Sequence, residues 1–276
     1  NDIDQAITWV SSRGGGRIVV SSNYDSITLL EGVSLFLMPN VTIQGVTIEN
    51  INGLTVEGSG TIDKLTIATA SGTSIHMNNI NTLDLQYSSN TVIEANNISL
   101  LTLYAATAAK IFCKNSINVA SIGYESTCDL FGCAEIGDLT VVSNTSLNLI
   151  DSRVLGKTNN ASRLQARGCE FKNETNTPSI ISNGNLLLEN CWVYSKLSNC
   201  IAMNTAQSNP SASLILDDTK LYCLDPAQYS VTANQRTPNL QVFVYGNSVA
   251  RTNMDTYCTP LINNLIINQD MSYKYF

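Results

Sequence analysis

The chain of 276 residues carries a net charge of −7, with 15 Lys and Arg against 22 Asp and Glu. Because its basic residues form no cluster, it lacks the positive patch that binds nucleic acid or anionic lipid, and neither partner is expected. No segment approaches the roughly 20 consecutive apolar residues that span a bilayer, so membrane insertion is not expected either. Charged residues make up only 13% of the chain, about half the usual share, which leaves Asn, Ser and Thr to cover the surface.

The N-terminal residues 1–17 are predicted to form a capping helix followed by a turn. Apolar residues recur at helical spacing, at Ile3, Ala6, Ile7 and Val10, and Gly14–Gly16 ends the pattern. Such a helix would cover the open end of a stack of strands and shield its unpaired edge.

Residues 18–157 contain an apolar motif that recurs at a nearly constant spacing. The motif begins seven times with two same-face residues separated by one other, from Ile27-x-Leu29 to Leu139-x-Val141. A second position recurs at Leu37, Val56, Ile75, Ile93, Phe112, Phe131 and Leu149, and a third at Ile43, Ile62, Ile80, Ile98, Ile117, Ile136 and Val154. Alternation at period two indicates strands, and a fixed period of roughly 20 residues indicates a solenoid. Each repeat is therefore predicted to be one turn of a parallel β-helix, in which the three apolar positions form three inward rows and each residue lies about 4.8 Å above its equivalent in the turn below.

Residues 158–255 are predicted to continue the β-helix with longer turns and side loops. Four further turns begin at Leu164-x-Ala166, Leu186-x-Leu188, Leu214-x-Leu216 and Val242-x-Val244. A corner column then reads Cys169, Cys191, Thr219 and Asn247, followed two residues later by a column of Phe171, Val193, Leu221 and Val249. Residues 256–276 are rich in apolar residues and end in an aromatic segment, and they are interpreted as a C-terminal cap or a subunit-contact tail.

The eight cysteines are interpreted mainly as small apolar core residues. Cys169 and Cys191 occupy equivalent corners of successive turns, which predicts mostly reduced thiols and folding in a reducing cytoplasm. Cys128 and Cys133 have no second pair at ligand spacing and His76 is the sole histidine, so no metal or other cofactor is expected.

Aligned on their first inward residue, the late turns place four polar residues at one outward position: Arg167, Glu189, Asp217 and Tyr245. In this register Glu189 and Asp217 would lie roughly 5 Å apart, the spacing of the carboxyl groups of a retaining glycosidase. They are the candidate catalytic residues, with Arg167 orienting a sugar acid. The alternative is a surface ladder of charges, each contact contributing less than about 1 kcal/mol.

Aromatic residues of the same turns are candidate sugar-binding residues: Trp192, Tyr194, Tyr222 and Tyr245. Trp192 is predicted to face outward, where a large apolar group needs a partner. That partner is either a glycan or a side loop or neighbouring subunit. The early turns offer mostly Thr, Ser, Asn and Ala outward, so no site is predicted there, and this weakly charged surface suits side-by-side packing in a trimer.

Three N-terminal segments, Ile3–Val10, Gly14–Val20 and Gly32–Leu35, resemble the entrance to the right-handed β-helix of the pectate-lyase-like superfamily, in particular that of bacteriophage tailspikes. Residues 186–193 resemble later coils of that superfamily. The resemblance implies right-handed coiling and, for the phage branch, a homotrimer with glycan sites on or between subunits. The chain departs from the polygalacturonase branch, because it has Asp217-Asp218 but neither the Gly-His-Gly nor the Arg-x-Lys motif.

The sequence therefore predicts an all-β fold, a single-stranded right-handed parallel β-helix with an N-terminal capping helix. The expected function is that of a bacteriophage tailspike or tail fibre component, a virion protein assembled in the host cytoplasm. It would act as a homotrimeric shaft and bind a bacterial surface polysaccharide or receptor. One alternative is a glycan depolymerase, a glycoside hydrolase or polysaccharide lyase, and another is a secreted or cell-surface adhesin of the same fold.

Overall fold

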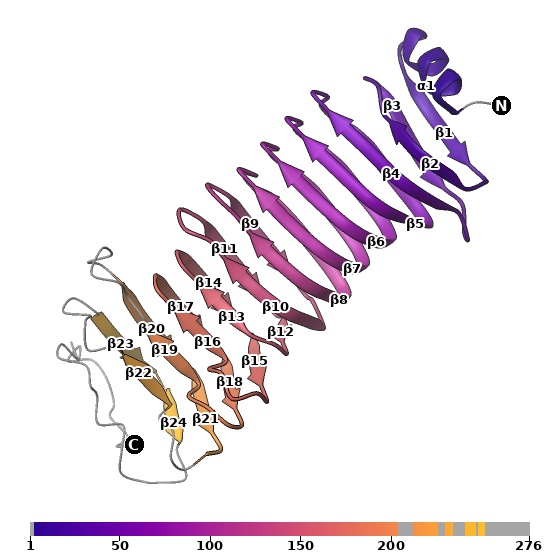
Figure 1. The fold of residues 1–276 in the computed structure, drawn as a ribbon. Coiled ribbons are helices and arrows are strands. Elements are labelled where there is room, and N and C mark those ends of the chain that lie inside the picture. The colour runs from indigo at the N-terminus through magenta and orange to yellow at the C-terminus, as the bar shows by residue number, and fades with distance from the viewer. Residues whose placement is uncertain (1–2, 204–211, 226–229, 234–240, 247, 252–276) are drawn as a thin grey trace. The chain divides into compact units, whose positions relative to one another are not determined.

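The computed structural model describes residues 3–203, 212–225, 230–233, 241–246 and 248–251. These residues form a parallel β-solenoid of about ten turns with one short N-terminal helix, as predicted (Figure 1). The chain divides into two compact units, the N-terminal unit (residues 1–134) and the C-terminal unit (residues 135–276). The predicted C-terminal cap at 256–276 lies outside the described residues.

Helix α1 (Ile3–Ser12) packs against the first strands of the N-terminal unit. It contacts β1 (Gly16–Val20), β2 (Tyr24–Thr28) and β3 (Val33–Leu37) and buries Ile3 and Ile7. The helix lies beside these strands, in the position of a cap (Figure 1). It is too short to span a membrane, and the described residues include no other helix.

The remaining strands of the N-terminal unit pair in parallel with the preceding turn. They are β4 (Thr42–Glu49), β5 (Thr55–Ala68), β6 (Ser74–Gln86), β7 (Val92–Tyr104), β8 (Ala109–Ile122) and β9 (Thr127–Phe131). The predicted first and third rows are confirmed in this unit. Ile43 pairs with Ile62, Ile62 with Ile80, Ile80 with Ile98 and Ile98 with Ile117, and all five side chains are buried.

The predicted second row is wrong at Phe112 and Phe131, which face outward. Ile93 instead pairs with Ile111, and Ile111 with Leu130, all three fully buried. The reason is a register shift, because the extra residue of that turn is inserted after Ile111, between Cys113 and Ser116. The prediction places the extra residue before Ile111, and it therefore assigns the outward face of the strand to the core.

At the start of the same row, Leu35 rather than Leu37 pairs with Val56. Leu37 is nevertheless buried, because it lies two residues further on the same face of β3. The predicted row is therefore displaced by two residues at this point, which leaves it on the correct face of the strand.

The C-terminal unit has three short strands per turn, and each pairs in parallel with the third strand after it. The first set is β10 (Glu135–Val141), β13 (Thr158–Asn160), β16 (Ile180–Ser182), β19 (Ile201–Met203) and β22 (Val231–Ala233). The second is β11 (Ser146–Ile150), β14 (Arg163–Arg167), β17 (Asn185–Glu189), β20 (Ser213–Asp217) and β23 (Gln241–Tyr245). The third is β12 (Arg153–Val154), β15 (Glu170–Asn173), β18 (Trp192–Ser195), β21 (Lys220–Cys223) and β24 (Val249–Arg251).

The prediction that Leu164 continues the first row in the late turns is wrong. Leu164 pairs with Leu147 of the second set, whereas Leu139 of the first row pairs with Thr158. The row passes through buried Asn160, whose side-chain amide donates to Ser182 Oγ at 2.9 Å. Because hydrogen-bonded polar groups can be buried, a search for apolar residues alone misses this strand.

The predicted columns also slip by one residue in the last turn. Leu221 pairs with Ala250 rather than Val249, and the Thr219 N–H donates to Ser248 Oγ at 3.0 Å. The corner position thus passes to Ser248, and Asn247 lies outside the described residues. An additional residue after Tyr245 accounts for the slip.

The seven cysteines within the described residues are all buried and free of disulfide bonds. Burial raises the pKa of the Cys128 and Cys200 thiols. Cys258 lies outside the described residues. The thiols of the described part therefore act as small core groups, as predicted.

Candidate functional site

The predicted outward column of the C-terminal unit is present in the register expected. Arg167 pairs with Glu189, Glu189 with Asp217 and Asp217 with Tyr245, on the consecutive strands β14, β17, β20 and β23. Parallel pairing places equivalent Cα atoms about 4.8 Å apart, so Glu189 and Asp217 are neighbours on the surface.

Glu189 is engaged by Arg167. The guanidinium Nε and Nη2 each lie 2.8 Å from Glu189 Oε2. The side chain of Arg167 is 67% exposed and that of Glu189 is 40% exposed, so water screens the pair and its contribution to stability is under about 1 kcal/mol. This oxygen of Glu189 therefore already has a partner on the side away from Asp217.

A separate cluster on β18 and β21 brings together three of the predicted sugar-binding residues, and we call it the aromatic ledge: Trp192, Tyr194 and Tyr222. Trp192 is 51% exposed, and its ring centroid lies 5.6 Å from that of Tyr222 with the planes tilted by 37°. Tyr194 and Tyr222 are register partners on the same outward side. The ledge combines a large open ring surface with two phenol hydroxyl groups.

Lysine side chains lie over the rings of the ledge. Lys220 Nζ is 4.9 Å from the Trp192 ring centroid, and Lys172 Nζ is 5.7 Å from that of Tyr194. Lys172 also contacts Glu174 at 2.7 Å, and this pairing raises the pKa of Lys172 and lowers the pKa of Glu174. The ledge therefore has a cationic margin held next to its aromatic faces.

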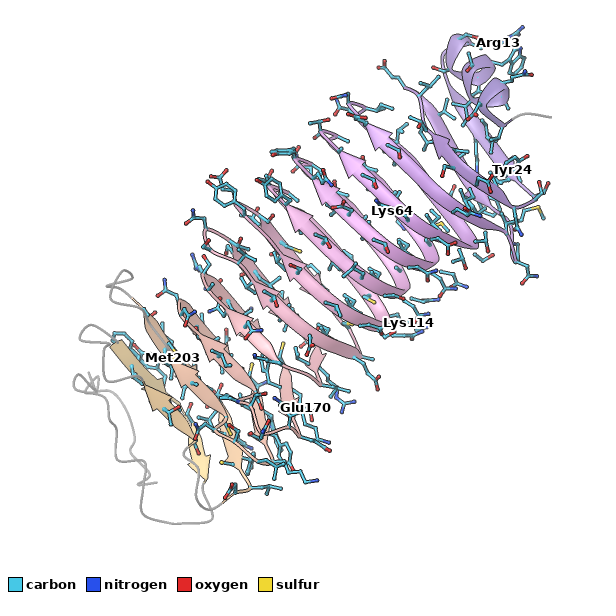
Figure 2. All side chains as sticks on the ribbon, in the orientation of Figure 1. Arg13, Tyr24, Lys64, Lys114, Glu170 and Met203 are labelled. Carbon is cyan, nitrogen blue, oxygen red and sulfur yellow. The ribbon has the colours of Figure 1, made fainter. Side chains whose placement is uncertain are left out.

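The strand before the ledge supplies a further ion pair. Glu170, labelled in Figure 2, is the register partner of Trp192, and its carboxylate lies 2.8 Å from Arg153 Nε. Tyr245 is not part of the ledge. It belongs to β23, where it continues the column of Glu189 and Asp217, and its ring stacks on that of Phe243 with the centroids 6.4 Å apart.

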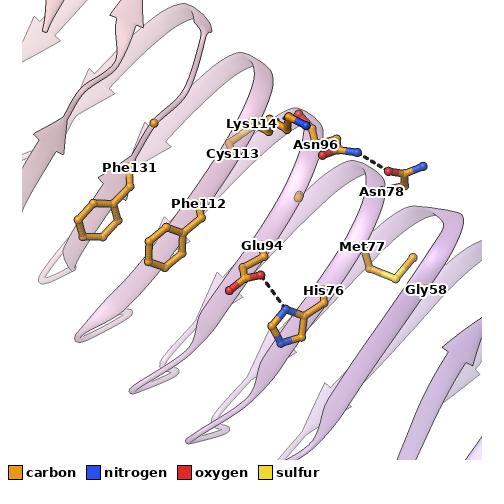
Figure 3. Close-up of a pocket in the computed structure, with 12 residues that line it drawn as sticks. Gly58, His76, Met77, Asn78, Glu94, Asn96, Phe112, Cys113, Lys114 and Phe131 are labelled. Atoms are coloured by element: carbon orange, nitrogen blue, oxygen red, sulfur yellow. Dashed lines mark hydrogen bonds and ion pairs between the residues drawn. The ribbon is translucent and has the colours of Figure 1, made fainter.

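A hollow of about 580 Å³ on the N-terminal unit was not predicted, and we call it the histidine groove (Figure 3). It is lined by an imidazole, a carboxylate, aromatic rings and an amine, from His76, Glu94, Phe112, Phe131 and Lys114. On its other side the Asn96 amide donates to Asn78 Oδ1. The volume lies within the range of small-molecule sites.

Parallel register assembles this groove from consecutive turns. His76 pairs with Glu94, Glu94 with Phe112 and Phe112 with Phe131. His76 Nδ1 lies 3.0 Å from Glu94 Oε2, and the two Phe rings stack at 4.7 Å with planes 10° apart. The sequence did contain a signal, since Glu94 follows His76 by one turn of the repeat. The prediction that Phe112 and Phe131 face the core conceals the groove, because these rings form part of its wall.

In the part of the chain that the structure describes, no three His, Cys, Asp or Glu side chains gather as they would around a metal ion. Comparisons of the chain with protein-family models, with curated proteins and with solved structures each found no match.

Proposed function

We propose that this chain is the β-solenoid shaft of a bacteriophage tailspike or tail fibre, and that it binds a bacterial surface glycan or receptor through the aromatic ledge. The observation that carries the proposal is the exposed ring of Trp192, flanked by Tyr222 and Lys220 on paired strands. Exposed aromatic rings that are clustered and flanked by polar groups are typical of a ligand-binding surface.

A saccharide fits the chemistry of the ledge. Sugar rings present apolar C–H faces that pack on aromatic rings, and hydroxyl or carboxylate groups that bond to the surrounding polar side chains. Lys172 and Lys220 add positive charge beside the rings, which favours a glycan containing acidic sugars. Because strands hold the three aromatic residues, little ordering is needed on binding.

Two further features support assembly of a phage component rather than a secreted adhesin. The seven described thiols are buried without disulfide bonds, which suits folding in a reducing cytoplasm. The low content of charged residues, 13% of the chain, suits close packing of solenoid faces in a homotrimer. Light scattering measures the oligomeric mass, and a monomer would count against the phage proposal.

The binding experiment compares the only two tryptophans. Trp9 on α1 and Trp192 are 58% and 51% exposed, so Trp9→Ala is a matched control for Trp192→Ala. Calorimetric titration with a panel of acidic and neutral bacterial polysaccharides should find one that binds. We expect Trp192→Ala to weaken that binding at least tenfold, about 1.4 kcal/mol, and Trp9→Ala to leave it unchanged. Equal affinities for the two variants would refute the assignment to the ledge.

A second candidate function, glycan depolymerisation, rests on the adjacency of Glu189 and Asp217 in the register. Incubation of the bound polysaccharide with the protein, followed by size-exclusion chromatography, tests it. Shortening of the polymer that disappears in Glu189→Gln supports catalysis, with Asp217 as its partner and Arg167 as the clamp. If the polymer keeps its length, depolymerisation is rejected and glycan binding alone is retained.

A further inference from the structure

We propose that Ser74, His76 and Glu94 form a hydrolytic relay at the edge of the histidine groove that cleaves small carboxylic esters. This activity is independent of glycan binding by the aromatic ledge.

The three side chains are joined by two hydrogen-bond contacts that run through opposite nitrogens of one imidazole. Ser74 Oγ lies 2.8 Å from His76 Nε2, and His76 Nδ1 lies 3.0 Å from Glu94 Oε2. In the neutral tautomer with its proton on Nδ1, the ring donates to Glu94 and accepts from the Ser74 hydroxyl. This is the arrangement by which serine hydrolases activate their nucleophile, and it is recognised by geometry rather than by fold.

The backbone holds this arrangement. Ser74 and His76 are two residues apart on β6 and therefore face the same side, while Glu94 on β7 is the register partner of His76. Ile75 between them is fully buried and anchors the strand in the core. The relay is thus built on paired strands, which hold side chains more firmly than loops do.

The reaction has two steps in which atoms and charge balance. Ser74 Oγ bonds to the ester carbonyl carbon as its proton passes to His76 Nε2, and that proton then leaves with the alcohol as the C–O bond breaks. Water attacks the resulting acyl-serine, His76 accepts a proton from it, and return of that proton to Ser74 Oγ releases the carboxylic acid. Glu94 is a positioning residue that holds the imidazole in the reactive tautomer.

The environment sets the substrate class and the expected rate. His76 and Glu94 line the groove that contains the Phe112 and Phe131 rings, so the groove offers apolar surface for an acyl or aryl group. The Ser74 N–H already donates to the Leu54 carbonyl at 2.8 Å, so the oxyanion takes its hydrogen bonds from side chains or water. Since one oxyanion donor contributes about 10²–10³-fold, turnover should be correspondingly slow.

Labelling with a fluorophosphonate, in which the serine oxygen displaces fluoride from phosphorus, tests the nucleophile directly. Mass spectrometry of peptides from the whole chain should find the adduct on Ser74. His76→Gln should lower the labelling rate at least tenfold. Ser121→Ala is the control, because Ser121 faces outward on β8 with Thr102 as its register partner, and it should label as the parent chain does.

Hydrolysis of p-nitrophenyl acetate tests turnover. Ser74→Ala should remove the enzyme-dependent rate, and Glu94→Gln should lower kcat at least tenfold with KM changed less than about twofold. Circular dichroism and thermal unfolding confirm that each variant is folded. An unlabelled Ser74, equal labelling in His76→Gln, or hydrolysis by Ser74→Ala at the parental rate would each overturn the proposal.

Discussion

Ile93 and Glu94 are neighbours in β7 that face opposite environments: Ile93 is fully buried, while the Glu94 carboxylate meets His76 on the outside at 3.0 Å. We expect Ile93→Asp to lower the free energy of unfolding by at least about 3 kcal/mol, because it buries an unpaired carboxylate. Glu94→Ala should change it by less than about 1 kcal/mol, since the side chain is 55% exposed. Urea unfolding measures both, and equal losses would contradict the register.

Gly58 has a backbone conformation that favours glycine, with φ of +137°. A Cβ there would collide with the Leu37 carbonyl oxygen and lie 2.7 Å from the Leu37 nitrogen. We therefore expect Gly58→Ala to destabilise the fold by about 2–4 kcal/mol. Gly53 is the control, with φ of +69° and open space around its added Cβ, so Gly53→Ala should cost only about 1 kcal/mol. A smaller loss at Gly58 than at Gly53, measured by urea unfolding, would contradict the tight approach to Leu37.

The ion pair of Arg167 and Glu189 is expected to contribute little to stability. Glu189→Gln should lower the unfolding free energy by less than about 1 kcal/mol, and the difference from the parent should shrink at high salt because the charges are screened. Thermal unfolding at low and high ionic strength measures this. A larger loss that is insensitive to salt would show that the pair is more than a surface contact.

The buried thiol of Cys128 should make stability depend on alkaline pH. Burial raises its pKa in the folded state, whereas the unfolded thiol ionises near its ordinary value of about 9. Above that pH the unfolded state binds fewer protons than the folded state, so the free energy of unfolding falls by about 1.4 kcal/mol per pH unit.

Cys128→Ala removes this dependence. Between pH 8 and pH 10.5, its stability deficit relative to the parent should shrink by about 2 kcal/mol. Urea unfolding at the two pH values measures it, and Leu130→Ala, a buried change without a titrating group on the same strand, should keep a constant deficit. A constant deficit for Cys128→Ala as well would mean that the folded thiol ionises as freely as the unfolded one.

Much of the fold could be predicted because its information is local and repeated. The alternation around Leu65 and Ile67 specifies a strand with one buried face, and the nearly constant spacing of the motif specifies stacking of similar turns. The outward column of Arg167, Glu189 and Asp217 followed in the same way. Its prediction needed only the correct register within neighbouring turns of equal internal spacing.

The sequence by itself determined the strand type, the solenoid repeat and the outward position of Trp192, since all three depend on period-two alternation and turn length. Only the tertiary structure decided which residue of a turn is the extra one, because a turn with one extra residue has the same length wherever that residue is inserted. The place of the insertion decides which later side chains move to other rows or faces. That choice put Phe112 and Phe131 outside. The structure also joined Thr158 to the row of Leu139, because buried hydrogen bonds of Asn160 take the place of apolar contacts there. It also fixed the contacts of His76 with Ser74 and Glu94, which depend on side-chain direction across paired strands.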